Sequence, residues 1–137
     1  MSASADPKPA VQYVNPDTLP PPNGYSHVAV VQGGRTLYVS GQVAMDRTGQ
    51  IVGKDDLRAQ TRQVFENLKA ALAAGGATLD NVVKTTIFVR DASQVATVRE
   101  VRNTYFTKHH PASSLVEVSR LVRPELLIEI EAVAVVP

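Results

Sequence analysis

The sequence predicts a single α+β domain in two layers, with a mixed β-sheet and two helices on one of its faces. A length of 137 residues suits one domain with its own hydrophobic core. Two segments carry apolar residues at helical spacing on one side only, so both helices should pack on the same sheet face. Five runs rich in β-branched and apolar residues are the predicted strands: 26–31, 36–43, 83–90, 114–121 and 127–136.

Pro20-Pro21-Pro22 followed by Asn23-Gly24 excludes a helix at the start of the chain. We therefore expect residues 1–24 to form a proline-rich arm that runs extended over the surface, and residues 25–137 to form the domain. Gln32-Gly33-Gly34-Arg35 is a turn signal, which predicts a β-hairpin between 26–31 and 36–43.

Cap residues mark both predicted helices. Asp55 or Asp56 should cap the first helix, and Gly75-Gly76 should end it with a left-handed residue. Asp91 or Ser93 should cap the second, which must end before Pro111. The apolar stripes are Leu57, Val64, Phe65, Leu68, Ala71 and Leu72 in the first helix, and Val95, Val98, Val101, Tyr105 and Phe106 in the second.

The composition excludes several classes of protein. Fourteen basic and 13 acidic residues give a formal charge of +1, which argues against a nucleic-acid surface. The chain has no cysteine, so disulfides and thiolate chemistry are excluded. No apolar run approaches the roughly 20 residues needed to cross a bilayer, and residues 1–10 do not resemble a signal peptide. We expect a cytoplasmic protein that does not bind membranes.

The last predicted strand, 127–136, is largely apolar on both faces, although Glu129 and Glu131 share one of them. Two helices can cover only one face of the sheet, so the other is expected to meet a second copy of the chain. A carboxylate on such a wall has a raised pKa and can relay a proton to water. The alternative, which we favour equally for Glu131, is an ion pair with a neighbouring strand or subunit.

The other polar candidates are individually weak. Gly41, between Ser40 and Gln42, can mark a bulge, a close backbone contact or a ligand contact. Tyr25 is either a packing anchor or a pocket wall. His27 is more consistent with a structural role than with a ligand, and His109-His110 lack companions at metal-ligand spacing, so neither metal nor cofactor is expected.

Four blocks of sequence resemble the Rid (reactive intermediate deaminase, or YjgF) family in order and spacing. They are YVSGQV at 38–43, KTTIFVRD at 84–91, PASSLVEV at 111–118 and IEIEAVA at 128–134. The resemblance covers residues 25–136. It implies a chorismate-mutase-like, YjgF-type fold and a homotrimer with clefts between subunits. Members of the family hydrolyse reactive enamines and 2-imino acids to 2-oxo acids and ammonia, without metal or cofactor.

The resemblance also implies roles for individual residues. Glu129 would activate water or shuttle its proton. Tyr25 and Phe88 would line the pocket, and the backbone around Leu115 would help to hold the attacking water. Backbone contacts to the substrate would come from Gly41. The remaining substrate-binding candidates are the neighbours Ser40, Ser113 and Ser114.

The chain departs from the family pattern at Ser113. Deaminating members carry Pro-Ala-Arg-Ser in this block, and their arginine holds the substrate carboxylate through a two-pronged pair. Serine cannot replace that contact, and no arginine occurs between Asn103 and Ser119. The substrate would then lack the carboxylate or have it held by another cation, for which the candidates are Lys108, His109, His110, Arg120 and Arg123.

The sequence leaves three hypotheses about the function. The first is hydrolysis of an imine or enamine other than a simple 2-imino acid. The second is a trimer that binds a small metabolite without turnover. The third is the translation inhibition or RNA cleavage assigned to some members of the family, against which the near-neutral charge argues.

Overall fold

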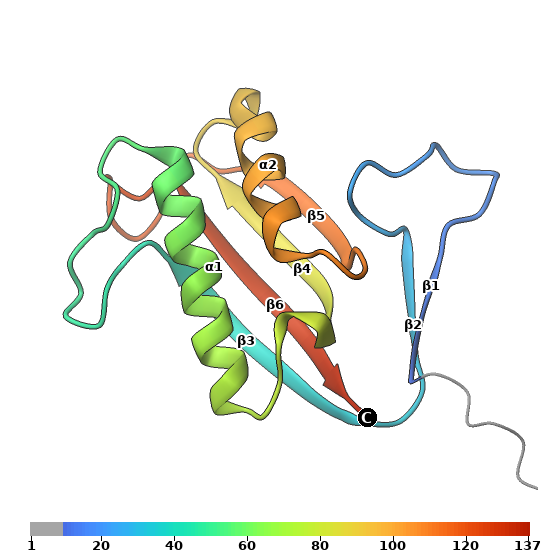
Figure 1. The fold of residues 1–137 in the computed structure, drawn as a ribbon. Coiled ribbons are helices and arrows are strands. Elements are labelled where there is room, and N and C mark those ends of the chain that lie inside the picture. The colour runs from blue at the N-terminus through green and yellow to red at the C-terminus, as the bar shows by residue number, and fades with distance from the viewer. Residues whose placement is uncertain (1–9) are drawn as a thin grey trace, which may run out of the picture.

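A computed structural model describes residues 10–137. Four strands form one sheet in the order β3-β6-β4-β5, in which β4 and β5 run parallel and the other neighbours run antiparallel. The predicted mixed sheet is confirmed (Figure 1). The elements are β1 (Val11–Val14), β2 (Val28–Val31), β3 (Arg35–Val43), α1 (Leu57–Ala74), η1 (Leu79–Asn81), β4 (Val82–Val89), η2 (Ala92–Gln94), α2 (Val95–Tyr105), β5 (Ala112–Glu117) and β6 (Ile128–Val136).

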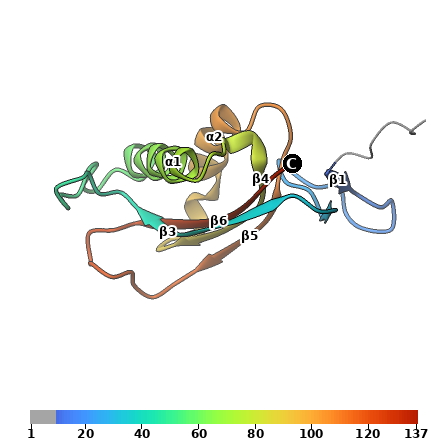
Figure 2. The same cartoon turned by 90° about the horizontal axis from the view of Figure 1, so that it is seen from below.

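Both α-helices lie on one face of this sheet, as predicted, and Figure 2 shows the two layers edge-on. The core fills the space between the layers, and its largest fully buried side chains include Phe65, Leu68 and Leu72 from α1. Alternate residues of β4 and β6 point into it, among them Ile87 and Ile130. The period of two in these strands thus determines which side chains the helices cover.

The predicted caps of α1 are confirmed. Asp56 accepts a hydrogen bond from the Ala59 amide at 3.0 Å, and the left-handed residue after the helix is Gly76, with φ of +81°. For the second helix the prediction was right only in part. Asp91 accepts from the Ser93 amide and caps the short 3₁₀ turn η2, whereas α2 itself begins at Val95 without a side-chain cap.

The predicted hairpin between 26–31 and 36–43 is wrong. The partner of β2 is β1, which pairs antiparallel from Val11↔Val31 to Val14↔Val28. The amide of Gln32 extends this ladder by donating to Ala10 O at 2.8 Å. Gly33 and Gly34 do form a turn, with φ of +66° and +80°, but a turn signal cannot specify which strand occupies the hydrogen-bonding edge of β2.

The β1–β2 ribbon is separate from the four-stranded sheet and stands beside it in Figure 1. Residues 1–9 of the predicted arm lie outside the described part of the chain. The remaining residues of the arm include β1. The predicted domain boundary at Tyr25 thus falls inside the loop that joins β1 to β2.

The sheet face opposite the helices has no cover within residues 10–137 (Figure 2). Tyr38 of β3 is 83% exposed and Val116 of β5 is 44% exposed. The two glutamates of β6 lie on this face, which we call the open face, because they alternate with the buried Ile128, Ile130 and Ala132. None of the helices in the described part of the chain is long and apolar enough to cross a membrane.

Candidate functional site

Glu129 lies on the open face with its carboxylate over Gly41. A methyl group added at Gly41 would overlap the carboxylate oxygen Oε2, so only glycine leaves room for this side chain. The pairing of β3 with β6 is irregular between Val39 and Gln42, so Gly41 sits in a bulge. Of the three interpretations of this glycine, the bulge and the close contact are therefore confirmed.

The environment of Glu129 favours its protonated form. Burial raises the pKa of this carboxyl above its ordinary value, and the negative charge of Glu131 raises it further. Among residues 10–137, no lysine or arginine lies within ion-pair distance of either glutamate. The two carboxyls therefore share one face without a counter-charge from their own chain.

Three other predicted residues share the open face with Glu129 or lie at its border. Phe88 of β4 is directly opposite Glu129 across the strand pair and is half-buried. Ser40 is exposed, and its carbonyl oxygen accepts from Gln42 Nε2 at 3.1 Å. Ser114 is exposed, and its hydroxyl accepts from Lys84 Nζ at 3.0 Å.

Tyr25, Ser113 and Leu115 form a second group around a small cavity of about 110 Å³. Ser113 and Leu115 alternate along β5 with the exposed Ser114 and Val116, so they point to the helix side of the sheet. Leu115 packs against the hydrophobic core, and the Ser113 hydroxyl accepts from Thr85 Oγ1 at 2.9 Å. The other lining residues are Asn23, Ile87, Val95, Arg99 and Arg102.

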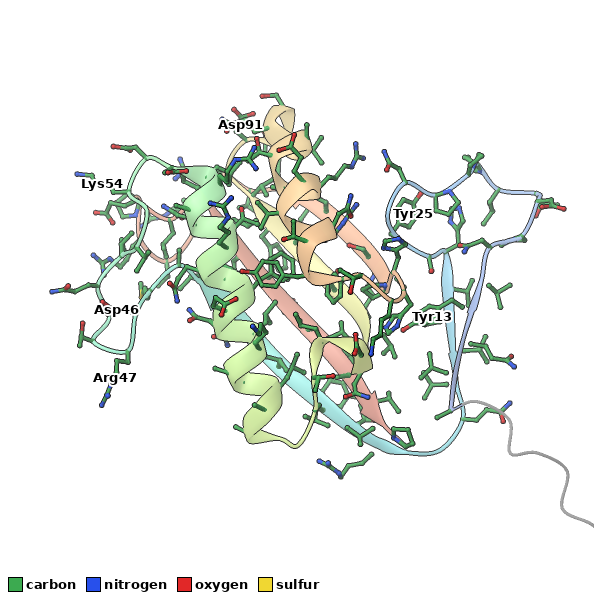
Figure 3. All side chains as sticks on the ribbon, viewed as in Figure 1. Tyr13, Tyr25, Asp46, Arg47, Lys54 and Asp91 are labelled. Atoms are coloured by element: carbon green, nitrogen blue, oxygen red, sulfur yellow. The ribbon has the colours of Figure 1, made fainter. Side chains whose placement is uncertain are left out.

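Ser26 holds Tyr25 at this cavity. Its amide donates to Pro111 O at 3.1 Å, and its hydroxyl donates to His110 O at 2.6 Å. These bonds tie the loop before β2 to the start of β5, which is where Figure 3 shows Tyr25. The Tyr25 ring also meets His27 edge-on, with ring centroids 5.4 Å apart.

One chain therefore divides the predicted site between the two sides of its sheet. Glu129, Gly41 and Phe88 belong to the open face, whereas Tyr25, Ser113 and Leu115 belong to the helix side. Within residues 10–137, the cavity lined by Tyr25, Ser113 and Leu115 includes no residue of the open-face group.

None of the five cations considered from the sequence lines the cavity beside Ser113. Lys108 pairs with Asp80 at 3.1 Å, and Arg123 pairs with Glu125 at 3.6 Å. His109 stacks on Tyr13 of β1 with ring centroids 4.9 Å apart. His110 contributes its carbonyl oxygen to Ser26, and Arg120 Nε donates to a neighbouring carbonyl oxygen.

The residue that sequence reasoning missed is Arg102 of α2. The helical pattern does not predict its burial, because Arg102 falls between the apolar positions of the helix, where polar residues are usually exposed. The structure buries it to 6% exposure at the cavity that contains Ser113. The only hint in the sequence was its place directly after Val101 on the buried side of α2.

Within residues 10–137, no three histidine, aspartate or glutamate side chains gather closely enough to hold a metal ion.

Comparisons with known proteins agree with this architecture. Residues 16–136 match the family model described as Endoribonuclease L-PSP. A RutC family protein of Pyrococcus horikoshii is 44% identical over 120 residues, covering 86% of this chain and 92% of its own. The 2-iminobutanoate/2-iminopropanoate deaminase of Salmonella typhimurium is 42% identical over 113 residues, covering 80% of this chain and 86% of its own.

A solved structure shares the fold. YyfB of Yersinia pestis, described as a member of the conserved Rid family, aligns with a TM-score of 0.86 at 39% identity, covering 93% of this chain and 99% of its own. The chain belongs to the Rid/YjgF family, which the family model describes as L-PSP. The predicted α+β fold with two helices on a mixed sheet is that of this family.

Proposed function

We propose that the protein hydrolyses small reactive imines or enamines to carbonyl compounds and ammonia, in sites completed by a second subunit of a homotrimer. Relatives about 42% identical carry the name of an imine deaminase, which supports this class of reaction. The observation that carries the proposal is the Glu129 carboxylate, which is held over Gly41 on the open face and has a pKa raised by burial and by Glu131.

In the proposed reaction, the oxygen of water adds to the carbon of C=NH. Glu129 takes a proton from that water and returns it to the nitrogen, which gives a carbinolamine. As the carbinolamine collapses, its hydroxyl proton passes through Glu129 to the nitrogen, the C–N bond breaks and C=O forms. One imine and one water thus yield one carbonyl compound and one ammonia. Because burial and Glu131 raise the pKa of Glu129, this carboxylate is a stronger base than an exposed one, which favours uptake of the proton from water.

The homotrimer is the part of the proposal that joins the two residue groups. The open face presents Tyr38, Phe88 and Val116 without cover from residues 10–137, and large apolar side chains on a sheet face favour association. Packing this face against the helix side of another subunit would bring Glu129 of one chain near the Tyr25–Ser113 cavity of the next. Ser40, Gly41, Ser114 and Leu115 would border the shared cleft.

We also propose that Ser113 changes the substrate relative to deaminases with arginine in this block. The serine hydroxyl is engaged with Thr85 and carries no charge, so it cannot clamp a carboxylate as arginine does. The substrate either lacks that carboxylate or binds it through another group.

The decisive experiment generates 2-imino acids in situ with an amino acid oxidase and measures how far the protein protects them from capture by semicarbazide. We expect Glu129→Gln to lower kcat/KM by about 10²–10⁴, the usual contribution of a positioned acid–base group. The matched control is Glu131→Gln, which removes the neighbouring charge and leaves the proposed catalytic group in place.

The Ser113→Arg variant tests the substrate assignment in the same assay. If the wild-type protein is inactive and Ser113→Arg gains an activity that depends on Glu129, the scaffold is catalytic and serine marks a different substrate. Should no variant turn over any imine, the hydrolase proposal fails and the trimer is a binding protein for a small metabolite. RNA cleavage receives no support from the near-neutral charge of the chain.

A further inference from the structure

Arg102 is a buried cation without an anionic partner. Only 6% of the residue is exposed, yet no carboxylate of residues 10–137 lies within ion-pair distance. The acceptors that it does have are neutral and distant. Nη2 donates to Asn23 O and to Asn103 Oδ1, and Nε also donates to Asn103 Oδ1, all at 3.3 Å. Nη1 donates to none of the described residues. Buried arginines are usually paired, so this one has unused binding capacity.

A second arginine increases the positive charge at the same place. Arg99 lies one helical turn before Arg102 on α2, and both line the 110 Å³ cavity with Ser113. Two like charges beside one cavity repel each other unless an anion lies between them. Burial and the charge of Arg99 both lower the pKa of Arg102, although an arginine remains protonated at neutral pH.

The loop before β2 is shaped to enclose the guanidinium. A methyl group added at Gly24 would overlap Arg102 Nη2 and lie 3.0 Å from Cζ, and φ of +73° at this residue also favours glycine. The next residue, Tyr25, lines the cavity beside Arg102. The loop therefore covers the Nη2 end of the guanidinium, and Arg102 lines the cavity beside this loop.

From these observations we infer that Arg102, supported by Arg99, forms an anion pocket beside Ser113 that binds one small carboxylate. The guanidinium offers a planar set of N–H donors that matches a carboxylate, and Tyr25 supplies the wall above it. A cavity of this size admits an acid of a few carbon atoms and excludes nucleotides and peptides. The geometry thus places a positive charge from α2 next to the position where deaminating members of the family carry arginine on β5.

The binding of a small carboxylate depends only on this geometry. That the carboxylate belongs to the substrate rests on the proposed function. In that case the protein would accept 2-imino acids after all, with the acid group held from the helix side and not from the strand.

The test is a titration of ¹⁵N-labelled protein with propionate, followed by NMR at constant ionic strength set with sodium chloride. Propionamide, which has the same shape without the charge, is the matched ligand control. We expect saturable shifts at the Arg102 Nε–H and at the amides of Tyr25 and Ser113 with propionate only. Arg102→Gln should weaken propionate binding about tenfold or more, whereas Arg102→Lys should keep part of it.

The control variant is Arg62→Gln, which removes the same charge from an exposed position of α1. Equal shifts with propionamide, no saturation with propionate, or full affinity in Arg102→Gln would each overturn the inference. If Arg102→Gln does not fold, the comparison of the two ligands on wild-type protein still decides. A wild-type protein that binds propionate but hydrolyses no imine would keep the pocket and lose the proposed function.

Discussion

The two sides of the sheet differ in how they are completed. On the helix side, α1 and α2 bury Phe65, Ile87 and Ile130 entirely within one chain. On the open face, the residues at alternating positions, such as Phe88 and Glu129, remain partly or largely uncovered. The first side makes the fold, and the second carries the Glu129 carboxyl group, which a second chain would enclose in the proposed trimer. The difference in cover separates residues that are buried within one chain from residues that are available for contact with another.

The largest expected contrast comes from truncating one aromatic residue on each side. Phe65→Ala empties a fully buried position and should lower the free energy of unfolding by about 3–5 kcal/mol. Tyr38→Ala removes a ring that is 83% exposed and should change the stability of the isolated chain by less than about 0.5 kcal/mol. Urea denaturation at low protein concentration measures both values.

Under the proposed trimer, Tyr38→Ala should instead weaken association. Its unfolding midpoint should then depend less on protein concentration than that of the wild type. Equal losses of stability for the two variants at every concentration would contradict the distinction between the sides.

Gly41→Ala sharpens the comparison on the open face alone. The added methyl group displaces the Glu129 carboxylate, which we expect to cost about 1 kcal/mol of stability because the carboxylate lies at the end of a flexible side chain. Imine hydrolysis should fall much further than stability. The control is Thr36→Ala, at an exposed position of the same strand that has no role in the candidate site. Similar activities in the two variants would refute the role of the bare backbone at Gly41.

The smallest expected effect is the pH dependence of Glu129. A carboxyl whose pKa is higher in the folded chain binds more protons when folded, so stability decreases as pH rises above the ordinary value of 4.5. Glu129→Gln removes this penalty. The variant should be slightly more stable than wild type at pH 7, and its advantage should disappear as pH falls below 4.5.

Denaturation curves across this pH range provide the check. Glu131→Gln should give a smaller gain, because it removes only the second cause of the shift. Identical pH profiles for wild type and Glu129→Gln would show that the carboxyl is not perturbed in the folded chain.

The sequence predicted the elements whose patterns are local. The stripe of α1, its Asp56 cap and the alternation in 83–90 and 127–136 follow from helical and strand periods, and all are found in the structure. Pairing between strands is not local. The partner of β2 could not be found from Gly33-Gly34, because β1 lies in a proline-rich segment without a strand pattern.

The candidate site shows the same limit. Successive side chains of a strand point to opposite faces, so Ser113 and Leu115 must face away from Ser114. The division of the candidate residues between the two sides of the sheet could therefore have been predicted. Arg102 could not, because its burial depends on the loop at Asn23 and Gly24, which is 78 or more residues away along the chain.

The mass of the wild-type protein in solution tests the proposed homotrimer most directly. The open-face residues around Glu129 and the cavity residues around Ser113 can meet in one site only if chains associate. Light scattering coupled to size exclusion, repeated over a range of protein concentrations, measures this mass. A homotrimer should have three times the chain mass of 14.7 kDa. A mass of a single chain at every concentration would contradict it and leave Glu129 on a face open to water.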